Sequence, residues 1–201
     1  MSQPTSGAAA STLQAAPVQQ PVVHRVAYFG FNGPIDSGAV TRICGALNTA
    51  VNNGYNEIYL AMNSPGGYIP DGIFLYNHIQ ALPIPVTMHN TGSVSSVATT
   101  IFVAAQRRLC APNAIFMMHP VALNATGLMG AKTLKASLQS ALHEEQRTDA
   151  ILRERARIPE DLLAKRLSED IYMTAQEALQ FGLVHEIGQF SLPAGSQIFQ
   201  I

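Results

Sequence analysis

A strand, a turn of small residues and a helix follow one another without a break in residues 85–105. Residues 85–89 (PVTMH) are β-prone, residues 92–96 (GSVSS) are small, and residues 97–105 are nearly all apolar. A serine in such a turn lies at a helix N-terminus, where its hydroxyl is clear of the backbone and free N–H groups face an incoming oxyanion. Serine is also common at helix starts, so this turn alone does not separate a nucleophile from a helix cap.

The same alternation of strand and helix patterns runs through most of the chain. The spacing of apolar residues and the positions of Gly and Pro predict strands at 26–30, 57–62, 85–89, 108–111, 114–118 and 183–187. The same signals predict helices at 37–51, 69–82 and 97–106 and a short helix that begins at Pro159. A capping box at residues 174–177 predicts a last helix that ends before Gly182. Strands that alternate with helices predict an α/β fold with right-handed crossovers.

Residues 128–157 differ from the rest of the chain. Leu134, Leu138 and Leu142 form an apolar stripe at helical spacing, and the following residues are strongly charged with both signs. This pattern predicts one long helix that leaves the body of the domain and is stabilised by mixed charges on its exposed faces.

Composition limits the class of protein. Charged residues are 12% of the chain, about half the usual share of roughly 25%, which suggests that contacts between identical subunits cover part of the surface. The net charge of −1 argues against nucleic-acid or anionic-lipid partners. No apolar run approaches the roughly 18 residues of a membrane span, and the two cysteines suit buried free thiols in the cytoplasm.

Three segments are expected. The first 23 residues carry no charge and few aromatic side chains, so we expect a flexible leader at 1–23. A single domain then covers 24–190, followed by a C-terminal tail at 191–201.

The residues needed for serine hydrolysis have candidates elsewhere in the chain. The Gly66-Gly67 turn can present a backbone N–H without a side chain in the way. Among six histidines, His119 ends an apolar strand and His89 is its main competitor as the base. For the acid that orients the base, Asp170 begins a new element, whereas Asp149 and Asp161 lie in helical stretches. Residue types alone do not decide between these candidates, or between Ser95 and Ser96.

Several motifs in order resemble the Clp protease proteolytic subunit family over about residues 26–187. They are Asn63-Ser64-Pro65-Gly66-Gly67, Gly92 with Ser96 four residues later, Met117-Met118-His119, the charged helix, and the run from Asp170 to Ala178 continued by Gly182-Leu183-Val184. The resemblance implies the fold shared by Clp proteolytic subunits and crotonases, a repeated β-β-α superhelix with a long protruding handle helix.

Position by position, the resemblance implies roles for five residues. Ser96 would be the nucleophile, His119 the base and Asp170 the orienting acid, while Gly67 and Val97 would supply the oxyanion-hole N–H groups. Ser96 lies 30 residues after Gly66, as in the family, and Ser95 falls on a small-residue position. The chain departs from the family at Val97-Ala98, where Met-Gly is usual, and at Pro120, which directly follows the histidine.

The resemblance also implies partners. It predicts a serine endopeptidase that needs neither a metal nor an organic cofactor, assembles into heptameric rings and a tetradecamer, and cleaves short peptides or unfolded proteins in a chamber. An AAA+ unfoldase is a possible partner, although the polar leader does not resemble the family's N-terminal segment. The alternatives are a crotonase-type enzyme that binds acyl-CoA, a serine-lysine dyad using Lys132 or Lys135, and a catalytically silent structural subunit.

Overall fold

The computed structural model describes residues 24–122 and 127–201, so the predicted leader lies outside the described residues. The strands are β1 (Val26–Asn32), β2 (Glu57–Ser64), β3 (Val86–Ser95), β4 (Arg107–Cys110), β5 (Ile115–Met118), β6 (Ile171–Thr174), β7 (Glu186–Ile187) and β8 (Ile198–Gln200). The helices are α1 (Ser37–Asn52), α2 (Ile69–Gln80), α3 (Val97–Phe102), α4 (Ala131–Arg155), α5 (Glu160–Lys165) and α6 (Ala175–Gln180).

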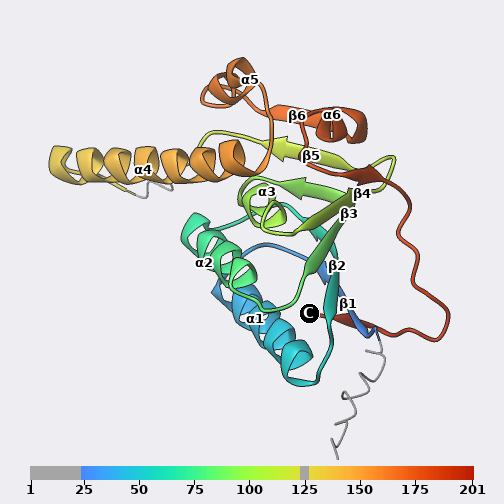
Figure 1. Cartoon of the computed structure of the whole chain (residues 1–201). Coiled ribbons are helices and arrows are strands. Elements are labelled where there is room, and N and C mark those ends of the chain that lie inside the picture. The colour runs from blue at the N-terminus through green and yellow to red at the C-terminus, as the bar shows by residue number, and fades with distance from the viewer. Residues whose placement is uncertain (1–23, 123–126) are drawn as a thin grey trace, which may run out of the picture.

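The described strands form one mainly parallel sheet. Its order is β6-β5-β3-β2-β1-β8, with β4 paired to β3 and β7 paired to β4. β1, β2 and β3 pair in parallel because α1 and α2 carry the chain back between them, and these two helices lie side by side (Figure 1). β5 and β6 are the antiparallel pair. The predicted α/β class is confirmed.

The apolar stripe predicted for the first helix faces the core. Ile43 and Leu47 are fully buried on α1, and the Asp36 side chain accepts the Ala39 N–H at 2.7 Å, which caps the helix. Burying a side chain of this size stabilises the fold by roughly 1.5 to 3 kcal/mol. The core therefore holds the strands whose ends carry the candidate site.

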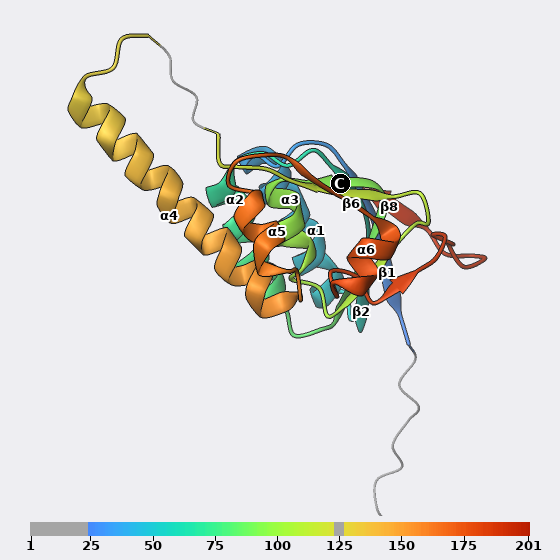
Figure 2. The same ribbon diagram turned by 90° about the horizontal axis from the view of Figure 1, so that it is seen from above.

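The predicted long helix is α4, which projects away from the sheet (Figure 2). Leu134, Leu138 and Leu142 are each about half exposed on it, with exposed fractions of 56%, 54% and 48%. Their apolar stripe has no covering element in the described part of a single chain. Among residues 24–122 and 127–201, no helix combines the length and apolar content required to cross a membrane.

A buried guanidinium ties the C-terminal end of α4 to the sheet. Arg108 on β4 donates to the carbonyl oxygens of Leu183, Arg155 and Gly182 at 2.9 to 3.0 Å. Burial lowers the pKa of Arg108 to about 10, so the side chain is still a cation at neutral pH. The surrounding carbonyl oxygens therefore stabilise the guanidinium charge without a carboxylate partner. They also hold the C-terminal end of α4 against β4.

Several elements differ from the sequence predictions. α3 ends at Phe102 instead of near residue 106, and β7 covers only Glu186–Ile187 of the predicted 183–187. β3 runs six residues further than the predicted end at His89, because its far end pairs with β5 as well as with β2. For the β6 region, the sequence analysis predicted only that a new element begins at Asp170, without predicting a strand. β8 lies in the predicted C-terminal tail and pairs in parallel with β1 at the sheet edge. Short strands such as β6 and β8 depend on long-range pairing that local sequence does not encode.

Candidate active site

Ser96 is the turn residue between β3 and α3, and its backbone is strained. It has a φ of 57°, and it is the one residue other than glycine with positive φ in the described parts of the chain. Its N–H donates to the Met117 carbonyl oxygen at 2.7 Å, which holds this conformation in place. A sharp strand-to-helix turn of this kind lifts the side-chain hydroxyl away from the backbone.

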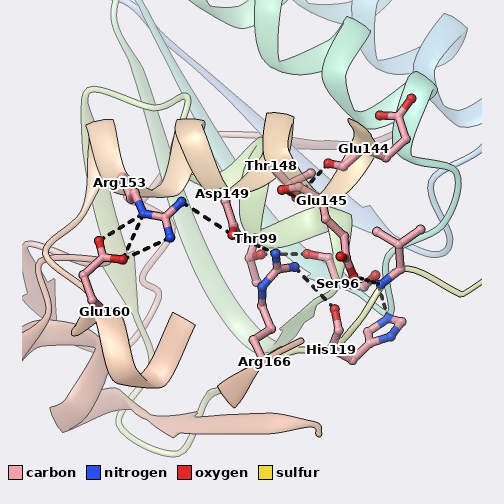
Figure 3. Close-up of polar contacts among 11 residues, drawn as sticks. Ser96, Thr99, His119, Glu144, Glu145, Thr148, Asp149, Arg153, Glu160 and Arg166 are labelled. Atoms are coloured by element: carbon pink, nitrogen blue, oxygen red, sulfur yellow. Dashed lines mark hydrogen bonds and ion pairs between the residues drawn. The ribbon is translucent and has the colours of Figure 1, made fainter. Parts of the chain in front are cut away.

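The structure separates the two adjacent serines. The Ser96 Oγ lies 2.8 Å from the Nε2 of His119, within hydrogen-bond distance (Figure 3). Ser95 is buried, and its Oγ contacts the Oγ of Ser93 instead. Parallel pairing of β3 with β5 brings the two strand ends together, because Ser95 lies opposite Met117, two residues before His119. Ser96 is therefore the serine that has an imidazole nitrogen within hydrogen-bond distance.

The Gly66-Gly67 turn lies directly against this serine. Gly66 has a φ of +93°, and a Cβ built on it would lie 2.5 Å from the Ser96 Cβ. The Gly66 carbonyl and the Tyr68 N–H both bond to Ile35, so the Gly67 N–H points to the other side of the turn. Within residues 24–122 and 127–201, that N–H makes no hydrogen bond. It is free to donate to a ligand.

The second predicted oxyanion donor begins α3. The first N–H groups of a helix have no acceptor within the helix, and Val97 is the first residue of α3. The Val97 side chain packs on Gly72, where a Cβ would lie 2.3 Å from its Cγ2. The side chain is therefore directed toward α2, and the main-chain N–H of this first helical residue stays available.

A cavity of about 580 Å³ opens beside Ser96 and His119. Its walls are the Gly67–Pro70 segment, the start of α3, the residues after His119, and one face of α4. The residues of α4 that line the cavity are Ser140, Ala141, Glu144, Thr148 and Leu152, and Arg166 lines it as well. The cavity is therefore large enough to take a ligand side chain next to Ser96.

Asp170 lies beside His119 in the strand register, but no described contact joins their side chains. β5 and β6 pair antiparallel with Met118 opposite Ile171, so one further step of this register places Asp170 opposite His119. Directly opposite residues have side chains on the same face and Cβ atoms about 5 Å apart. Asp170 is exposed, and among the described residues its carboxylate has no hydrogen bond to the imidazole. Its role as the orienting acid stays a prediction.

His89, the competing base, is a buried packing residue. It is fully buried on β3, its Nδ1 lies 2.6 Å from the Tyr59 hydroxyl, and its Nε2 lies 3.0 Å from the Gly188 carbonyl oxygen. The carbonyl can only accept, so Nε2 carries the proton and Nδ1 accepts from the hydroxyl. Both ring nitrogens are bonded to groups away from the serine, so His119 is the candidate histidine that contacts Ser96.

His89 makes the stability of the protein sensitive to acid. Burial lowers the pKa of His89 and raises the pKa of Tyr59 to about 12. Because the unfolded chain takes up the proton near pH 6.5 and the folded chain only at lower pH, the free energy of unfolding should fall as pH drops below about 6.5. The variant His89→Gln should lose less stability between pH 7 and pH 5 in urea titrations.

A control separates His89 from His185, the second histidine whose pKa is lowered. Burial, and then Arg108, also lower the pKa of His185, so both the wild type and the His89 variant keep that contribution. His185→Gln should therefore remove a separate part of the acid sensitivity. Identical acid sensitivity of the wild type and His89→Gln would contradict the prediction.

The other candidate groups lie apart from the serine. Lys132 and Lys135 are exposed near the start of α4, and neither lines the cavity. Asp161 is exposed on α5. Among the described residues, no group of three or more His, Cys, Asp or Glu side chains is arranged to hold a metal ion.

Asp149 is buried, but it faces a residue that the sequence analysis did not single out. Its carboxylate pairs with the guanidinium of Arg166, which also donates to the His119 carbonyl oxygen at 3.4 Å (Figure 3). Glu145 on the same helix accepts the Val121 N–H at 2.9 Å. No short motif links these residues, because the contacts join positions 17 to 47 residues apart.

Comparisons with known proteins point to one family. The family model described as Clp protease matches residues 22–190. The chain is 29% identical over 157 residues to the ATP-dependent Clp protease proteolytic subunit 3 of Rhizobium etli, covering 77% of this chain and 80% of that protein. The proteins of the same name from Rhizobium johnstonii and Rhizobium meliloti match with the same identity and coverage.

Proposed function

The chain belongs to the Clp protease family, and from that premise we propose that it is a serine endopeptidase in which Ser96, His119 and Asp170 form the triad. The observation that carries the proposal is the 2.8 Å contact between the Ser96 Oγ and the His119 Nε2 at a strained strand-to-helix turn. The register that places Asp170 opposite His119 supports the third member.

Each group has one step in the proposed reaction. The Ser96 Oγ attacks the peptide carbonyl carbon and gives its proton to the His119 Nε2. The Gly67 and Val97 N–H groups receive the negative oxygen of the tetrahedral intermediate, each worth roughly 3 to 4 kcal/mol. His119 then protonates the leaving amine, and water releases the acyl group by the same route. Asp170 keeps the proton on Nδ1, so that Nε2 is free to accept.

Assembly follows from the exposed face of α4. We propose that the stripe of Leu134, Leu138 and Leu142 packs against α4 of a second copy, joining two heptameric rings into a tetradecamer. About half of each leucine is exposed in the single chain, and burying that surface favours association. An enclosed chamber would restrict substrates to short peptides or unfolded proteins. Coupling to an AAA+ unfoldase and a cytoplasmic location stay predictions.

The alternatives receive no support from the site. Among the described residues that line the cavity, the glycine turn and the start of α3 provide no carboxylate of the kind that the acyl-CoA alternative needs, and the acid present is Glu144 of α4. The Ser96 to His119 contact weighs against a silent subunit.

A fluorophosphonate probe tests the proposal on the full chain. Such probes react only with an activated serine, so the wild type should be labelled and Ser96→Ala should not. Ser95→Ala is the matched control, and it should keep the labelling because the Ser95 hydroxyl faces Ser93. Equal labelling of the wild type and Ser96→Ala would remove Ser96 from the role of nucleophile.

A further inference from the structure

The carbonyl of His119 lies just beyond the last pair of the β5–β6 ladder. That pair joins Met118 to Ile171, so His119 is at the exit of the strand. Pro120 follows it and has no N–H to donate, and the next N–H, of Val121, is bonded to Glu145. The donor that reaches the His119 carbonyl oxygen is the Nη1 of Arg166.

Arg166 is itself fixed by α4. Its side chain is 6% exposed, and its Nη2 pairs with the Oδ1 of Asp149, whose side chain is 10% exposed. Asp149 also lies 3.5 Å from Arg153, which pairs with Glu160 at the surface. An ordered chain of charges therefore runs from the surface of α4 to the backbone of His119 (Figure 3).

We propose that Arg166 and Asp149 form a positioning pair that holds the His119 backbone so that the imidazole stays within reach of the Ser96 hydroxyl. The inference rests on the proposed function, in which His119 is the base. Neither residue is bonded to the serine. Arg166 also lines the cavity, so the measured KM separates positioning through His119 from direct contact with the substrate. Removing the pair should lengthen the distance from Nε2 to Oγ, which is 2.8 Å in the intact protein.

A role in stability alone does not account for this arrangement. A buried ion pair often stabilises a fold no better than apolar residues of the same volume, because desolvation of both charges offsets their attraction. In addition, the Arg166 Nε is buried and has no hydrogen-bond partner among the described residues. The contact that an apolar pair cannot replace is the hydrogen bond to the His119 carbonyl.

The variants separate the effect of the ion pair on stability from its effect on the position of His119. Arg166→Met leaves Asp149 buried without its main partner, so it should be less stable than the wild type. The double variant Asp149→Leu/Arg166→Met removes both charges and should regain most of the lost melting temperature. It still lacks the donor to His119. Arg166→Lys keeps the charge on a single ammonium and should rescue only part of the activity. Arg153→Met is the matched control, because it removes the pair with Glu160 and the 3.5 Å contact with Asp149 but leaves Arg166 bonded to Asp149 and to the His119 carbonyl.

The variants are compared by melting temperature, peptide hydrolysis and crystal structure, using the full chain. In the double variant we expect kcat to fall about 10-fold to 100-fold with KM within about twofold, because misplacing a reacting group by about 1 Å costs rate on this scale. Arg153→Met should keep the wild-type kcat. In the crystal structure of the double variant, the distance from Nε2 to Oγ should exceed hydrogen-bond range.

Two results would overturn the inference. A folded double variant that hydrolyses peptide at the wild-type rate would show that the pair serves stability only. An unchanged distance of 2.8 Å in its crystal structure would do the same, and this measurement does not depend on activity. The proposed function is tested separately. If it is wrong, the fluorophosphonate probe labels Ser96→Ala as strongly as the wild type, whatever the Arg166 variants do.

Discussion

Replacing His119 by alanine is expected to lower kcat for a fluorogenic peptide by about six orders of magnitude, and Ser96→Ala should cost about the same. Without the imidazole, no described group within hydrogen-bond distance of the Ser96 Oγ can accept its proton. Because the two residues act as a unit, the double variant Ser96→Ala/His119→Ala should be no slower than either single variant. Initial rates at saturating peptide measure all three.

Two controls accompany this prediction. His143→Ala removes an exposed histidine of α4 and should leave kcat unchanged. Lys132→Ala and Lys135→Ala should do the same, because both lysines are exposed and neither lines the cavity. Activity that survives in His119→Ala and disappears in a lysine variant would establish a serine-lysine dyad instead.

Gly67→Ala is expected to lower kcat by about 100-fold to 1000-fold, the usual cost of losing one oxyanion donor. A Cβ at this position would lie 1.9 Å from the Ile35 carbonyl oxygen, so the backbone of the turn must move. The Gly67 N–H then leaves the side of the turn that faces the cavity, while Ser96 and His119 keep their own contacts. Steady-state kinetics should show the loss mainly in kcat, because the oxyanion forms only after the substrate is bound.

The matched control is a glycine with open space around it. Gly45 lies within α1, and a Cβ there would meet no atom within 4 Å. Gly45→Ala should stabilise the protein by up to about 1 kcal/mol through helix propensity and keep full activity. Melting curves show whether Gly67→Ala is folded. A folded Gly67→Ala with wild-type kcat would exclude this N–H as an oxyanion donor.

Periodic local patterns predicted most of the fold. The spacing of Ile43 and Leu47 predicted α1, and the capping box at Thr174 and Glu177 is present at the start of α6. The long charged helix was predicted from its leucines and mixed charges, and it is α4. β6 and β8 were not predicted as strands, because short strands are stabilised by their partners rather than by their own residues.

The sequence by itself determined the set of candidates, because turns, strand ends and motif spacing are local properties of a chain. It supplied a serine turn, a glycine turn, two plausible histidines and several acids. Tertiary structure decided which of them meet. The pairing of β3 with β5 brings Ser96 to His119, whereas Ser95 turns to Ser93 and His89 bonds to Gly188.

The same reason explains what the sequence did not reveal. Asp149 was one of several acids in a helical stretch, and Arg166 was an unremarked cation 17 residues further on. Their pairing, and the contact of Arg166 with the His119 carbonyl, exist only because α4 and the segment after α5 pack on the end of β5. Hydrogen bonds across 17 or 47 residues depend on how the whole chain folds, and no local pattern records them.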